Sequence, residues 1–71
     1  MSAKLPEEIR SMYTDAYKLH ETFTGMANTE ENWTKVCNTV SEISRHHEDH
    51  PLIIQLLIAV MGQLEREVNG A

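Results

Sequence analysis

The chain contains few of the residues that build disulfides, metal-thiolate sites or long loops. Its 71 residues include one cysteine, three glycines and two prolines. A single cysteine cannot form an internal disulfide, and alone it cannot supply the thiolates of a zinc site. Because glycine and proline are the main residues that interrupt regular structure, their scarcity favours a fold with short connections.

Basic residues and long apolar runs are also scarce. Six lysines and arginines stand against eleven acidic residues, which gives a formal net charge of −5. Since phosphate contacts require clustered basic side chains, we expect no nucleic-acid binding. No run reaches the roughly 18 apolar residues of a membrane span, and the opening MSAKLPEE lacks the pattern of a secretory signal. We therefore expect a cytoplasmic protein that contacts no membrane.

The pattern that is present is helical periodicity, in three segments of what we expect to be one domain (1–71). The first segment, 6–23, carries an apolar stripe at Leu5, Ile9, Met12, Ala16, Leu19 and Phe23. The second begins at Asn28 or Thr29 and carries its stripe at Trp33, Val36, Cys37, Val40 and Ile43. Gly25 and the His50–Pro51 step mark the two breaks, because each disfavours continuation of a helix.

The third segment, 51–68, is apolar over a wider arc than the other two. Between Leu52 and Leu64, only three residues interrupt the apolar run: Gln55, Gly62 and Gln63. The sequence therefore predicts an all-α fold, a compact three-helix bundle with short loops and the third helix at its centre. Both other stripes should meet one face of this helix, formed by Ile53, Leu57, Val60 and Leu64.

Two short helices cannot cover the whole apolar arc of the third. In a monomer we expect three of its side chains to face solvent: Ile54, Ile58 and Met61. Burying one such side chain is worth about 1.5–3 kcal/mol, so an exposed set predicts an interface, most simply in a twofold homodimer. The alternative is a monomer in which the flank is covered by Trp33, Tyr13 and Tyr17. For a heterologous partner, the acidic balance of the chain favours a basic surface.

The segment 45–50, RHHEDH, concentrates side chains that bind metals. Imidazole suits zinc, nickel and cobalt, so His46, His47 and His50 form a candidate site. The carboxylates that could complete it are Glu42, Glu48 and Asp49. Successive helical residues point about 100° apart, so His46 and His47 can share a metal only if the helix ends between them. A metal-binding module is therefore the alternative function, and a polar helix end is the competing structural explanation.

No arrangement typical of an active site is visible. His20 lies beside Tyr13 and Tyr17, but proton transfer there needs a carboxylate from elsewhere in the chain. Cys37 falls on an apolar stripe, where a cysteine behaves as a small core residue. A DNA-reading third helix is disfavoured because the first turns of 51–68 contain no basic residue. We therefore expect a non-enzymatic interaction protein that uses no cofactor.

Overall fold

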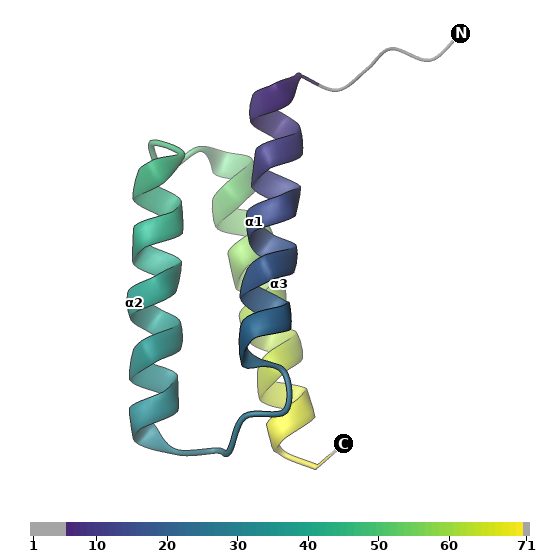
Figure 1. The fold of residues 1–71 in the computed structure, drawn as a ribbon, viewed down its shortest axis with the longest axis vertical. Coiled ribbons are helices and arrows are strands. Elements are labelled where there is room, and N and C mark those ends of the chain that lie inside the picture. The colour runs from purple at the N-terminus through teal and green to yellow at the C-terminus, as the bar shows by residue number, and fades with distance from the viewer. Residues whose placement is uncertain (1–5, 71) are drawn as a thin grey trace, which may run out of the picture.

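The structure is a computed structural model and describes residues 6–70. It contains three helices, α1 (Glu7–Phe23), α2 (Glu30–His46) and α3 (Pro51–Val68), and no strand within the described range. Consecutive helices run in opposite directions and are joined by short turns (Figure 1). The predicted all-α three-helix bundle is thus confirmed, while Leu5 of the first predicted stripe lies outside the described residues.

Side-chain caps explain where the second and third helices begin. The hydroxyl of Thr29 accepts a hydrogen bond from the backbone N–H of Asn32 at 3.1 Å, which satisfies a donor that the helix itself leaves free. The Nδ1 atom of His50 accepts from the N–H of Leu52 at 3.0 Å. Pro51 then occupies the first helical position, where its missing N–H costs nothing.

The core lies mainly between α1 and α3. One cluster of buried side chains joins the two helices: Met12, Leu19, Ile53 and Leu57. Leu64 is also fully buried, and Val60 packs against the cluster. The predicted inward face of the third helix is therefore confirmed, and α1 is its principal partner.

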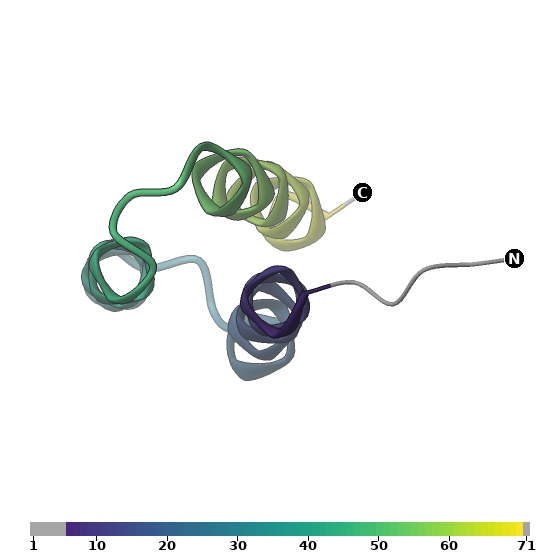
Figure 2. The ribbon, with the colours of Figure 1, turned by 90° about the horizontal axis from the view of Figure 1, so that it is seen from above.

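Helix α2 packs less extensively against α1 and α3 than these two helices pack against each other. Val36 is its only buried residue, whereas Val40 and Ile43 are partly buried against the core cluster. Viewed from above, α2 is set apart from the closely packed α1 and α3 (Figure 2). The prediction that Cys37 is buried is wrong, because its side chain is exposed. The buried face of α2 is narrow, and a residue one step beyond Val36 is rotated about 100° away from it.

Candidate functional site

A groove with many apolar lining residues runs between α2 and α3. Near the turn that joins the helices it has a volume of about 570 Å³. The residues that line this part are Val40, Ser41, Ser44, Arg45, Asp49, Ile54, Leu57, Ile58 and Met61. Ile58 and Met61 also line a second part of about 500 Å³, together with Trp33, Gly62 and Glu65. Because the two parts share residues, we treat them as one surface, the α2–α3 groove.

Two isoleucines of α3 are exposed at this groove. Ile54 is 38% exposed and Ile58 is 54% exposed, as the width of the apolar arc predicts. Met61 is partly buried in the same groove. Trp33, Tyr13 and Tyr17, which the alternative monomer prediction placed over this flank, leave both isoleucines open to solvent. Tyr13 and Tyr17 are themselves exposed on α1 and line neither part of the groove.

Charged side chains lie at the two ends of the groove. Arg45 and Asp49 line the end near the α2–α3 turn, and Glu65 lines the other end. Asp49 is engaged within the chain, since it accepts a hydrogen bond from the hydroxyl of Ser44 at 2.7 Å. Neither Arg45 nor Glu65 forms an ion pair with any residue in 6–70. Asp49 likewise forms no ion pair in this range, so the groove carries one cation, Arg45, and two carboxylates, of which Asp49 already accepts a hydrogen bond from Ser44.

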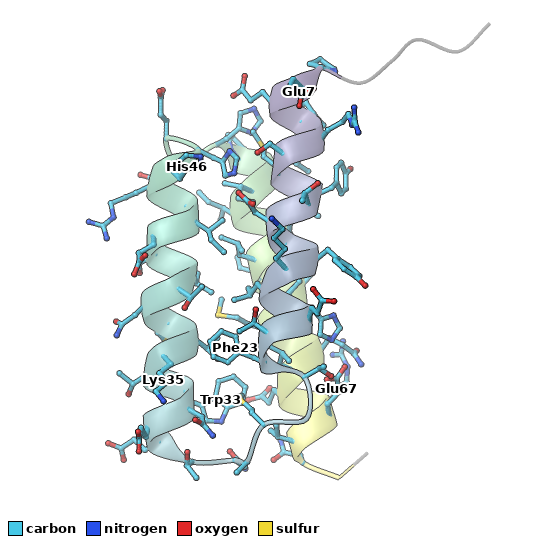
Figure 3. All side chains as sticks on the ribbon, viewed as in Figure 1. Glu7, Phe23, Trp33, Lys35, His46 and Glu67 are labelled. Carbon is cyan, nitrogen blue, oxygen red and sulfur yellow. The ribbon has the colours of Figure 1, made fainter. Side chains whose placement is uncertain are left out.

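Trp33 forms one wall of the groove at the end that carries Glu65. It projects from the lower end of α2 toward the other helices, whereas His46 lies at the upper end of α2 (Figure 3). Its indole N–H donates to the Oδ1 atom of Asn28 at 2.7 Å. This bond holds the polar edge of the indole, and the ring gives the groove an aromatic wall, of a residue type enriched among binding hot spots.

The histidines of the segment 45–50 take three different positions. His46 is the exposed last residue of α2, His47 is buried, and His50 caps α3. The Nε2 atom of His47 lies 2.7 Å from Oδ2 of Asp15, so this pair ties α1 to the α2–α3 turn. The helix does end between His46 and His47, and their ring centroids are 5.0 Å apart in an edge-to-face arrangement.

The surroundings of these histidines are polar. His46 and His47 line a pocket of about 350 Å³ with Glu8 and Glu48. Glu42 is exposed on α2 and does not line this pocket. Within residues 6–70, no three His, Cys, Asp or Glu side chains are arranged to hold a metal ion. Two of these histidines have structural contacts instead: His47 pairs with Asp15, and His50 caps the start of α3.

A second His–carboxylate pair lies at the other end of the bundle. The Nε2 atom of His20 lies 2.8 Å from Oε2 of Glu67, which also accepts from Gln63 at 3.2 Å. The hydroxyl of Thr24 donates to the other carboxylate oxygen at 2.9 Å. The carboxylate that sequence analysis found lacking for His20 thus comes from α3, 47 residues away. These hydrogen bonds, led by that from His20, hold the pKa of Glu67 below its ordinary value of 4.5.

The lowered pKa of Glu67 predicts a measurable loss of stability in acid. The carboxylate stabilises the fold above about pH 4.5, and this contribution is lost as the pH falls through the lower, folded-state pKa. We therefore expect Glu67→Gln to melt earlier than the parent near pH 7 and to lose less further stability between about pH 5 and 3. Circular dichroism melts at each pH measure this. Glu42→Gln, at an exposed position of α2, is the control and should keep the parent's profile; an unchanged profile in Glu67→Gln contradicts the prediction.

Neither Asp15 nor Glu67 is recognisable from the sequence alone as a partner of a histidine. Both residues stand next to the apolar stripes of their helices, beside Ala16 and Val68 respectively. A carboxylate at the border of a buried face needs a donor nearby, because an unpaired charge there is costly. That position is the only sequence indication of the two pairs, and it does not say which histidine each carboxylate meets.

Comparison with protein-family models, with curated proteins and with solved structures gives no match to this chain. None of the helices described above has the length and apolar character needed to cross a membrane.

Proposed function

We propose that this chain is a small non-enzymatic interaction protein of the cytoplasm that self-associates as a homodimer through the α2–α3 groove. The observation that carries the proposal is the exposure of Ile54 and Ile58 on a helix whose other face forms the core. A contiguous apolar patch beside a groove is typical of an interaction site. The free, exposed thiol of Cys37 agrees with a reducing compartment.

The apolar surface at the groove supplies the driving force for association. Removing apolar surface from water is worth about 25 cal/mol per Å², so covering a half-exposed isoleucine contributes about 1 kcal/mol. In a twofold dimer each such contact is made twice. The exposed ridge of one α3 can lie in the groove of the other copy, which brings α2 and α3 of both copies together as a four-helix layer. Because association itself costs at least about 4 kcal/mol, we expect a weak dimer whose population falls on dilution.

The charge of the groove favours a second copy over a strongly basic partner. The chain as a whole is acidic, with a net charge of −5. The groove itself is mixed, since Arg45 lies at one end and Glu65 at the other, and Asp49 is bonded to Ser44. A basic surface would be repelled by the guanidinium of Arg45. A second copy, in contrast, brings a carboxylate for Arg45 and a guanidinium for Glu65.

The absolute mass in solution tests the proposal. Light scattering behind size exclusion, over about a hundredfold range of concentration, should give twice the 8.1 kDa chain mass at high concentration and a falling mass on dilution. A mass of one chain at every concentration overturns the proposal.

The same measurement with a chelator separates the alternative function from the proposed one. A homodimer held by the groove keeps its mass in excess EDTA. A dimer that dissociates on addition of EDTA and re-forms with zinc instead assigns association to a metal held by His46 and His47. The variant His46→Ala then tests the ligand: if His46 binds the metal, zinc no longer restores the dimer of this variant.

A further inference from the structure

We infer that the two copies pack antiparallel about a twofold axis that passes between the two α3 helices, level with the midpoint of Ile58 and Met61, so that Arg45 of each copy pairs with Glu65 of the other. This inference rests on the proposed function and specifies its geometry. It follows from the order of the side chains along the groove and from the positions of Arg45 and Glu65, neither of which forms an ion pair or a side-chain hydrogen bond among the described residues.

Four side chains of α3 form a stripe along the groove, and their spacing is the same in either direction along the helix. Ile54, Ile58, Met61 and Glu65 follow one another at spacings of four, three and four. The midpoint of this stripe lies between Ile58 and Met61. If a second α3 lies along the first in the opposite direction, Ile58 meets Met61 of the second copy, and Ile54 meets the end that carries Glu65. An antiparallel arrangement about this midpoint therefore places Ile58 and Met61, both apolar, against each other at the centre of the interface.

The same reversal brings the guanidinium of Arg45 to the carboxylate of Glu65 at both ends, while Asp49, at the same end as Arg45, stays hydrogen-bonded to Ser44 of its own chain. Arg45 shares its end of the groove with Ile54, and α2 and α3 run in opposite directions (Figure 1). In the antiparallel arrangement this end therefore lies against Glu65 and Trp33 of the second copy. A guanidinium can bind a carboxylate with two hydrogen bonds and can stack on an indole face. A parallel arrangement would instead place Arg45 against Arg45 and Glu65 against Glu65.

The space above Gly62 agrees with an axis at this position. Gly62 lies inside α3 and lines the groove next to Met61. A Cβ atom built there would meet only the Nη1 atom of Arg66, at 3.9 Å. The monomer thus has no steric need for glycine, although glycine inside a helix is less stable than alanine. Without a side chain at this point, a second α3 can approach the backbone closely.

Charge reversal at the two ends tests the geometry. We expect Arg45→Glu and Glu65→Arg each to raise the dissociation constant of the dimer at least about 10-fold, because each places two like-charged pairs across the interface. The double variant restores both pairs with the signs exchanged, and its dissociation constant should return to within about threefold of the parent's. Sedimentation equilibrium measures all three, and far-ultraviolet circular dichroism checks that each variant is folded.

Lys18→Glu is the matched control, since Lys18 is exposed on α1 and the substitution changes the net charge as much as Arg45→Glu does. It should leave the dissociation constant near that of the parent. If the parent dimerises but the two single reversals act no more strongly than Lys18→Glu, or the double variant is not restored, the antiparallel pairing is wrong and the dimer stands. If the parent is monomeric throughout, the proposed function itself fails.

Discussion

Ile58→Glu is expected to convert the homodimer into a folded, helical monomer. Ile58 is 54% exposed in the single chain, so a glutamate there keeps its carboxylate in water and costs the monomer little stability. In the dimer the same carboxylate would be enclosed among apolar side chains near the twofold axis. Burial of an unpaired charge costs several kcal/mol, which raises the dissociation constant at least about 100-fold.

Light scattering and circular dichroism on the same sample measure this result. Tyr17→Glu is the control, because Tyr17 is 67% exposed on α1 and lies outside the groove. It introduces the same charge and should leave the mass unchanged. An Ile58→Glu chain that is unfolded would place Ile58 in the core, and one that still dimerises would move the interface to another surface.

Leu57→Ala is expected to cost about 2–5 kcal/mol of folding stability. Leu57 is 1% exposed and belongs to the buried cluster that joins α1 to α3, so its truncation leaves a cavity that the helices cannot fully close. A domain of this size has a total stability of roughly 4–10 kcal/mol. The melting temperature should therefore fall by about 10 °C or more.

Thermal and urea melts of Leu57→Ala are best made in the Ile58→Glu background, where dissociation of the dimer does not contribute. Ile54→Ala in that background is the control, because Ile54 is 38% exposed and should cost less than about 1 kcal/mol. Equal losses for the two variants would show that α3 is rotated from the orientation described here.

The helices and the core face of α3 were predictable because they depend on local periodicity. The spacing of Ile53, Leu57 and Leu64 predicts one buried face, and the width of the apolar arc predicts that Ile54 and Ile58 stay outside it. Both predictions agree with the structure. The wrong prediction for Cys37 has a tertiary cause, since periodicity alone does not say how wide a face α2 buries.

The polar pairs and the ends of the groove could not be predicted in the same way. His47 meets Asp15 across 32 residues and His20 meets Glu67 across 47, so each pair depends on how α1 lies on the rest of the bundle. The sequence shows histidines in a row, and only the fold separates them into an exposed residue, a buried pair and a helix cap.

The close packing of α1 against α3 has a consequence for how the protein is made. During synthesis α1 and α2 leave the ribosome before α3, yet the partners of Met12 and Leu19 in the buried cluster, Ile53 and Leu57, belong to α3. A nascent chain that ends before α3 therefore has little core to form, and contacts so distant in sequence slow folding relative to a local helical hairpin. We expect the core and the α2–α3 groove to appear together, after the whole of α3 has emerged. Until then the apolar stripe of α1 is open to chaperones.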